Sequence, residues 1–148
     1  MNTYSEHFLN IEKKILSELK TILSLRNLRS MKDDSSYVTK ADLLVQQIIE
    51  DYFNTNFSNF IFVSEEKTNE NIDLSKNQMI VVLDPIDGTE NFTSGLPEWG
   101  IGISIYVGNQ HKSSFILIPE LKISLASGQT IDYFQSRIDG LSLSLIHI

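Results

Sequence analysis

The N-terminal part of the chain carries hydrophobic residues at helical spacing. Between residues 8 and 23, apolar side chains recur every three or four positions, and charged side chains fall mainly on the other side. A polar stretch at 27–36 then predicts a loop. A second helix is predicted from Thr39, whose hydroxyl can cap it, with Asp42 three positions on in a capping-box arrangement. This helix is expected to end between residues 54 and 59.

From residue 60 onward the pattern becomes that of strands. Short apolar runs occupy 60–63 and 79–83, and each stops at acidic residues. Residues 101–107 alternate Ile and Val with Gly, Ser and Tyr, a period of two that is typical of a strand. Further strands are expected at 115–118 and 121–125. Two helices followed by a run of strands predict an α+β layered domain rather than alternating βαβ units.

The end of the chain lacks the usual signs of a finished domain. Residues 141–148 alternate apolar and polar positions but stop on apolar residues, with no turn or cap after them. They could form an edge strand, but the abrupt end suggests a truncated reading frame with a foreign tail.

Composition narrows the classes of function. A formal net charge of −7 and a pI near 4.8 argue against a nucleic-acid module held by a basic face. The absence of cysteine excludes disulfides and thiolate metal sites. Charged residues interrupt any N-terminal signal-peptide core, and no apolar run approaches the roughly 20 residues of a membrane helix. The sequence therefore predicts a soluble, cytoplasmic protein with neither a nucleic-acid polymer nor a membrane as partner.

Acidic residues gather in one part of the sequence. The segment from Glu65 to Glu98 holds eight acids against two lysines. Such a run is usually a solvated face, but here Glu65 and Glu66 end one predicted strand and Asp84 ends the next. Because the ends of adjacent strands lie side by side, Glu65 and Asp84 could converge. Crowded carboxylates repel unless they are protonated or bridged by cations, and oxygen ligands without a Cys or His cluster favour Mg²⁺.

The segment 84–89 reads D-P-I-D-G-T. Pro85 fixes its φ, lacks an N–H and is expected to bend the chain off the strand. Asp84 and Asp87 can then project toward a shared space, with the carbonyl of Ile86 turned inward between them. On spacing alone, a simple turn with an aspartate cap is the competing interpretation.

The last two positions of this segment favour an anion. Gly88 permits a tight backbone, and Thr89 offers a hydroxyl and an N–H. A helix that begins near Thr89 would present free N–H groups to a phosphate. The sequence contains no P-loop, and its two aspartates are separated by two residues rather than one, which disfavours a phosphatase with a nucleophilic aspartate.

Several segments resemble, in their order and rough spacing, the inositol monophosphatase family: 38–42, 64–66, 84–92, Pro97 and 99–107. The resemblance covers roughly residues 5–128 and implies an Mg²⁺-dependent, lithium-sensitive phosphomonoesterase. The implied fold is the N-terminal part of a layered αβαβα sugar-phosphatase type, with two helices packed on a mostly antiparallel sheet. Residues 1–128 would then be an N-terminal metal-binding α+β domain, and 129–148 a tail that is truncated or not native.

The resemblance also implies a metal site. Glu65, Asp84 and the carbonyl of Ile86 are similar to the ligands of a first Mg²⁺ ion, and Asp84 and Asp87 to ligands of a second. Asp42 is similar to an acid that stands near the metals in that family without binding them directly.

The remaining implied roles concern the reaction. Glu65 and Thr89 resemble the catalytic pair that orients the attacking water, and Gly88, Thr89 and Asp87 resemble residues that bind the small phosphorylated substrate. The implied activity is hydrolysis of a phosphate monoester, such as an inositol monophosphate, by a metal-activated water. A same-fold phosphatase acting on a 3′-phosphonucleotide or a sugar phosphate is the alternative.

One departure from the family pattern matters. A second half of the family carries a W-D-x-x-A segment whose Asp completes the second metal site. Trp99 is the only Trp here and is followed by Gly100, so this segment is absent. We therefore expect the N-terminal half of a phosphatase, which as a fragment could be a catalytically incomplete metal-binding protein. A homodimer could complete the site.

Overall fold

The computed structural model describes residues 4–31, 37–64, 77–127, 131–138 and 141–142. Three helices are present in these residues: α1 (Ser5–Ser24), α2 (Lys40–Asn56) and the short α3 (Thr89–Ser94). One small sheet pairs two strands, β1 (Arg29–Met31) and β2 (Tyr37–Thr39). The main sheet has seven strands in sequence order: β3 (Phe60–Ser64), β4 (Met79–Asp87), β5 (Gly100–Val107), β6 (Gln110–Ile118), β7 (Ile123–Ser127), β8 (Ile131–Ile138) and β9 (Leu141–Ser142).

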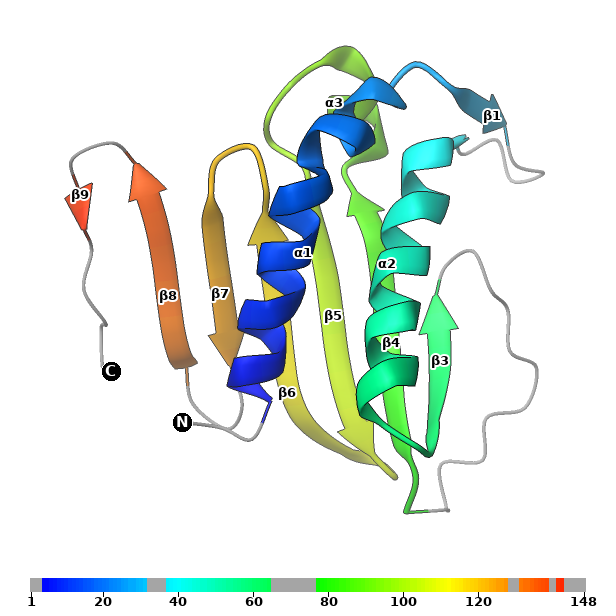
Figure 1. Cartoon of the computed structure of the whole chain (residues 1–148), viewed down its shortest axis with the longest axis vertical. Helices are drawn as coiled ribbons and strands as arrows, with labels where there is room; N and C mark the ends of the chain where they lie inside the picture. Colours follow the sequence, from blue (N-terminus) through cyan, green and yellow to red (C-terminus); the bar gives the residue numbers. More distant parts are fainter. Residues whose placement is uncertain (1–3, 32–36, 65–76, 128–130, 139–140, 143–148) are drawn as a thin grey trace.

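The helices α1 and α2 lie side by side over one face of the main sheet (Figure 1). Only β3 and β4 run parallel, whereas every other neighbouring pair in this sheet is antiparallel. The prediction of an α+β fold with two helices on a mostly antiparallel sheet is therefore confirmed. No helix of the described residues is both long enough and apolar enough to cross a membrane.

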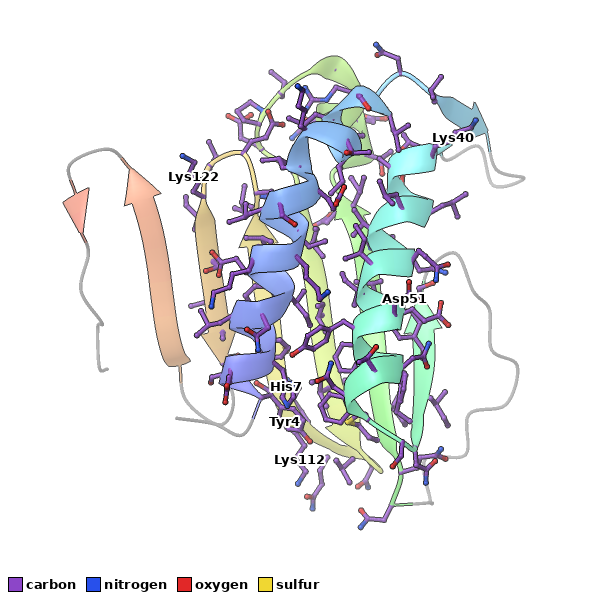
Figure 2. All side chains as sticks on the ribbon, viewed as in Figure 1. Tyr4, His7, Lys40, Asp51, Lys112 and Lys122 are labelled. Carbon is purple, nitrogen blue, oxygen red and sulfur yellow. The ribbon has the colours of Figure 1, made fainter. Side chains whose placement is uncertain are left out.

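The core lies between the helix layer and the sheet, where side chains fill the space (Figure 2). Phe8 of α1 stacks on Phe115 of β6, with ring centroids 5.0 Å apart. The alternation predicted for 101–107 puts Ile101, Ile103 and Ile105 into this core with at most 1% of each exposed. Burial of these large side chains accounts for the attachment of both helices to one face of the sheet.

The capping box predicted at the start of α2 is present. The Thr39 hydroxyl accepts hydrogen bonds from the N–H groups of Ala41 (3.1 Å) and Asp42 (3.3 Å). In return, Asp42 Oδ2 accepts from the Thr39 N–H (2.8 Å) and from its hydroxyl (2.6 Å). These bonds satisfy N–H groups that a helix start would otherwise leave without partners.

Several element boundaries differ from the sequence prediction. The expected loop at 27–36 contains β1, a three-residue strand too short to leave a periodic pattern. The strand β4 does not stop at Asp84 but continues through Pro85 to Asp87. Because the β4–β5 ladder shifts register between Asp84 and Asp87, the missing N–H of Pro85 costs no regular ladder bond.

The C-terminal strands also differ from the prediction. Strand β6 begins at Gln110, earlier than expected, and β7 begins at Ile123 because Lys122 adopts a left-handed turn conformation with φ 55°. Strand β8 lies within the predicted tail at 129–148 and pairs with β7. Whether that tail is native remains a prediction.

Candidate metal and phosphate site

The parallel strands β3 and β4 end at the same edge of the sheet, where α3 also lies (Figure 1). Ser64, the last residue of β3, pairs with Leu83 of β4. The buried Ser64 hydroxyl donates a 2.5 Å hydrogen bond to Gln46 Oε1 of α2, which fixes the end of β3. Glu65 follows Ser64 in the sequence as Asp84 follows Leu83. Glu65 lies outside the described residues, and its convergence with Asp84 remains a prediction.

An irregularity in β4 brings its two aspartates to one face. Asp84 pairs with Gly102 and Asp87 with Gly100, so that one extra residue of β4 lies between the two pairs. Side chains three positions apart in a regular strand point to opposite faces. The extra residue reverses this alternation, and because paired residues share a face, Asp84 and Asp87 both lie on the face of Gly100 and Gly102.

That face is the one turned away from α1 and α2. The residues of β5 that alternate with its glycines face the helices and are buried. On the opposite face, Val82 and Ile116 are 38% and 50% exposed. Gly100 and Gly102 allow a close approach of neighbouring groups, since a Cβ at Gly102 would stand 3.9 Å from the Cβ of Asp84 and one at Gly100 only 3.3 Å from the carbonyl oxygen of Leu117. Asp84 is half-buried, and Asp87 is exposed.

Sequence reasoning missed the part played by these two glycines. The alternation at 101–107 was enough to predict a strand, but Gly102 within it and Gly100 just before it put glycine at two successive outward positions. Glycine inside a strand often marks a bulge or a close approach, and this was the signal that could have located the close approach.

The turn after β4 requires glycine. Gly88 has φ 81°, in the left-handed region that favours glycine. Immediately after it, α3 begins at Thr89, and the Thr89 hydroxyl donates a 3.1 Å hydrogen bond to the carbonyl of Ile86. A carbonyl oxygen has two lone pairs, so Ile86 can accept this bond and still offer an electron pair to a cation.

The described donors fit a divalent cation of the Mg²⁺ type as an open site. Asp84 and Asp87 supply carboxylate oxygens on one face, and Ile86 supplies a carbonyl oxygen. Mg²⁺ prefers such hard ligands and keeps several water molecules rather than filling an all-protein cage. The described part of the chain contains no group of three or more His, Cys, Asp or Glu side chains placed to hold a metal ion.

Asp42 occupies a structural position near this edge. Its side chain is 3% exposed, and its Oδ2 atom is bonded to Thr39 in the cap of α2. Strand β2, which ends at Thr39, contacts α3. The capping task of Asp42 is evident from these bonds, whereas an influence on a metal remains a prediction.

A pocket of about 350 Å³ adjoins the turn. Its lining comes from the turn, α3 and the helix-free side of the sheet, and includes Asp87, Gly88, Asn91, Trp99, Gly100 and Ile116. One wall therefore carries the carboxylate and backbone of the D-P-I-D-G-T segment, while much of the rest is apolar. Glu98 also lines the pocket, so an anionic group could bind beside its two carboxylates only with cations between them.

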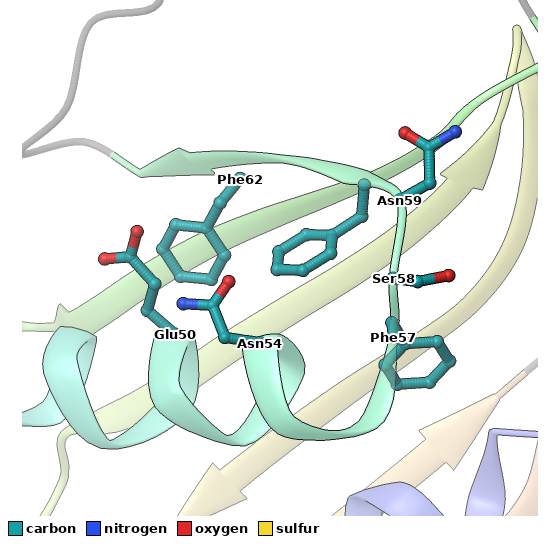
Figure 3. A pocket seen from close by; sticks show the side chains of 7 residues that line it. Glu50, Asn54, Phe57, Ser58, Asn59 and Phe62 are labelled. Atoms are coloured by element: carbon teal, nitrogen blue, oxygen red, sulfur yellow. The ribbon is translucent and has the colours of Figure 1, made fainter.

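A larger hollow of about 540 Å³ lies elsewhere, between the C-terminal half of α2 and β3 (Figure 3). Glu50 and Asn54 face Phe62 across it. None of the predicted site residues lines this hollow. Although this hollow is the larger of the two, its lining does not support it as the site of the chemistry that the sequence suggested.

Comparison with known proteins identifies the family. The model of the inositol monophosphatase family matches residues 4–138. The chain belongs to this family. It is 26% identical to the 3′(2′),5′-bisphosphate nucleotidase CysQ of Haemophilus influenzae over 94% of its length and 54% of that protein's.

Solved structures of this family share the fold. The inositol monophosphatase (IMPase) of Thermotoga maritima superposes with a TM-score of 0.68 at 24% identity, covering 90% of this chain and 52% of that one. An IMPase/NADP phosphatase complexed with Mg²⁺ and phosphate gives a TM-score of 0.67 at 22% identity, covering 92% and 53%. The family model thus confirms the predicted family, and the solved structures confirm the predicted fold. The chain spans about half the length of these relatives.

Proposed function

We propose that this member of the inositol monophosphatase family serves the Mg²⁺-dependent hydrolysis of a phosphate monoester. The observation that carries the proposal is the shared face of Asp84 and Asp87, which results from the extra residue in β4. Two carboxylates and the Ile86 carbonyl form a donor set that suits Mg²⁺. The match to a named nucleotidase and to a fold that binds Mg²⁺ and phosphate in a relative supports the same chemistry.

Each residue has a proposed part in holding the ions. Asp84, the Ile86 carbonyl and Glu65 would hold one Mg²⁺, and Asp84 with Asp87 would hold a second. Bound Mg²⁺ would polarise the attacking water and neutralise the phosphoryl oxygens. Such cations would be needed because the bare carboxylates of the site would repel an anionic substrate, and the protein's net charge of −7 acts in the same direction.

The turn residues would position the reactants. Glu65 and the Thr89 hydroxyl would orient the water in line with the leaving group, which lowers the entropy cost of the attack. The N–H groups of Gly88 and Thr89 would hold the phosphate, with Asp87 at the same wall of the pocket. In this mechanism water attacks directly, and no covalent phosphoryl-enzyme forms.

The substrate is proposed as an inositol monophosphate or a related phosphomonoester. A 3′-phosphonucleotide is the second candidate, favoured by the bisphosphate nucleotidase relative that matches 94% of the chain. A sugar phosphate suits the same site. We further propose a cytoplasmic location, and a homodimer as one way to complete the site.

The test is phosphate release from inositol monophosphate and from a 3′-phosphonucleotide, with and without Mg²⁺, by the protein and by any longer product of the same reading frame. We expect release that depends on Mg²⁺. Release that proceeds equally well after chelation of Mg²⁺ would contradict the proposal. Mg²⁺ binding without any release would instead identify the catalytically incomplete metal-binding alternative.

A further inference from the structure

Four side chains from distant parts of the chain, one of them from α3 itself, contact one another on the buried side of this helix. Arg26, just after α1, donates a hydrogen bond to Glu120 Oε1 in the β6–β7 turn, and the Trp99 indole N–H donates to the same oxygen at 2.6 Å. The Arg26 guanidinium carbon lies 4.9 Å from the ring centroid of Phe92 in α3. Phe92 also meets Trp99 edge-on, with centroids 4.8 Å apart. These four residues, hereafter the Phe92 seat, have no proposed role in the chemistry above, although Trp99 also lines the pocket beside the turn.

The seat is well shielded from water. Phe92 and Trp99 are at most 2% exposed, and the side chains of Arg26 and Glu120 are only 18% and 21% exposed. A pair of opposite charges at this depth is screened less than one at the surface, and hydrogen bonds to a carboxylate are stronger than neutral ones. A cation over an aromatic ring adds a further attraction. The seat therefore has several mutually supporting interactions focused on one ring.

Helix α3 depends on such support because it is short. It has six residues, far below the roughly 12 that an isolated helix needs in water. Its N-cap is Gly88, which has no side chain to cap the helix, and its C-cap is Gly95. Both glycines are left-handed, and Phe92 is the one buried residue of α3. The orientation of α3 must therefore come from where Phe92 is held.

Phe92, whose ring the seat holds, is linked by its backbone to the turn at residues 86–89. The Phe92 N–H donates to the Gly88 carbonyl at 3.0 Å, and the Thr89 hydroxyl donates to the Ile86 carbonyl at 3.1 Å. Asn91 adds a 2.7 Å bond from its side-chain amide to the carbonyl of Glu98, which closes the segment between α3 and β5. A displacement of Phe92 would thus be passed on to Gly88, Thr89 and the Ile86 carbonyl.

We propose that Arg26, Glu120 and Trp99 are positioning residues that set the geometry of the Ile86–Thr89 turn through Phe92. The catalytic meaning of this inference rests on the proposed function, whereas the mechanical part does not. Arg26 and Trp99 each touch both the carboxylate of Glu120 and the ring of Phe92, and Arg26 is the one of the two that carries a charge.

The mechanical part is tested on the ligand-free protein by amide hydrogen exchange. In Arg26→Met, we expect exchange at the Phe92 amide to accelerate at least tenfold more than at a core amide such as that of Ile105. Arg26→Lys, which keeps the positive charge, should restore part of the protection. The matched control is Ser124→Ala, which removes the 3.0 Å bond from Ser124 to Glu12 between β7 and α1. In this variant, hydrogen exchange at the Phe92 and Ile105 amides should accelerate by the same factor. Equal acceleration at the two amides in Arg26→Met would overturn the inference.

The link to the site is tested with inorganic phosphate and Mg²⁺, followed by the amide shifts of Gly88 and Thr89 and by the emission of Trp99, the only tryptophan in the sequence. We expect Arg26→Met to weaken phosphate binding at least fivefold and to alter Trp99 emission, and Ser124→Ala to do neither. Unchanged binding in an Arg26→Met protein with a loosened Phe92 would overturn the positioning role. If the unmodified protein shows no phosphate response, the proposed function fails while the exchange comparison still decides whether the seat controls the turn.

Discussion

The two halves of β4 show how one strand serves two purposes. From Met79 to Leu83 the strand pairs regularly with both β3 and β5, and its alternate residues enter the core. From Asp84 to Asp87 the described pairing is with β5 alone and contains an extra residue. The regular half gives stability through burial, whereas the irregular half gives up ladder bonds and gathers polar groups on one face. The comparison teaches that the break in pattern, more than the charge itself, marks the candidate site.

The largest expected effect is a loss of activity, without a loss of stability, when a carboxylate of the irregular half is changed. Replacing Asp84 by Asn removes a charged ligand with almost no change in shape. In the active protein, we expect Mg²⁺-dependent phosphate release to fall by about 10³-fold or more, an effect comparable to the loss of a preorganised transition-state contact. The midpoint of urea unfolding should change little, because Asp84 is only half-buried. Near-normal turnover in this variant would remove Asp84 from the mechanism.

The preceding residue should show the opposite behaviour. Leu83 is 2% exposed, and its truncation to Ala would leave a cavity in the core. We expect a loss of about 3 kcal/mol in the free energy of unfolding, measured by urea denaturation. Exposed Val82→Ala is the control and should cost much less. Equal losses of unfolding free energy in the two variants would contradict the claim that the regular half of β4 stabilises the fold through its buried side chains.

A smaller effect is expected at the turn that ends the irregular half. Gly88→Ala places a side chain at φ 81°, which costs about 1–2 kcal/mol of backbone strain. The added Cβ itself meets only an ordinary contact, 3.4 Å from the carbonyl of Glu98. Gly102→Ala is the matched control, because its backbone lies outside the positive-φ region. Thermal unfolding should therefore separate the two variants, and equal losses would argue against strain as the cause.

The smallest effect concerns an ionisable group in the packed region. Burial is the main cause that raises the pKa of Tyr52 above 10.0, Glu6 acts in the same direction, and a hydrogen bond with Asn10 opposes them. A tyrosine with a raised folded-state pKa contributes stability that is fully present below the unfolded pKa and is lost as pH rises through the folded one. Urea unfolding at about pH 9 and about pH 11 should thus show a decline that is smaller in Tyr52→Phe. An unchanged decline in this variant would assign it to other groups.

Local signals made much of the fold predictable. The capping box at Thr39 and Asp42 needs only neighbours in sequence, and the apolar alternation of β5 follows from the core it faces. The shared face of Asp84 and Asp87 could not be predicted in this way, since Pro85 indicated a bend away from the sheet rather than an extra residue within the pairing.

Contacts between distant residues were out of reach for a different reason. Arg26 and Glu120 are separated by 94 positions, and no periodicity relates them. The Phe92 seat depends on how α1, α3 and the β6–β7 turn are brought together, which only the folded chain determines. The family resemblance supplied the roles of the D-P-I-D-G-T residues, but not the interactions that hold them.

The central claim is that Asp84, Ile86 and Asp87 gather around a divalent ion. Its most direct test is addition of Mn²⁺, which suits the same oxygen ligands as Mg²⁺, to the isotope-labelled protein, followed by NMR. The account predicts that substoichiometric Mn²⁺ broadens the amide signals of Asp84 and of residues 86–89, leaves those of β7 sharp, and is displaced by excess Mg²⁺. Broadening confined to other regions, or unchanged broadening in Asp84→Asn, would contradict it.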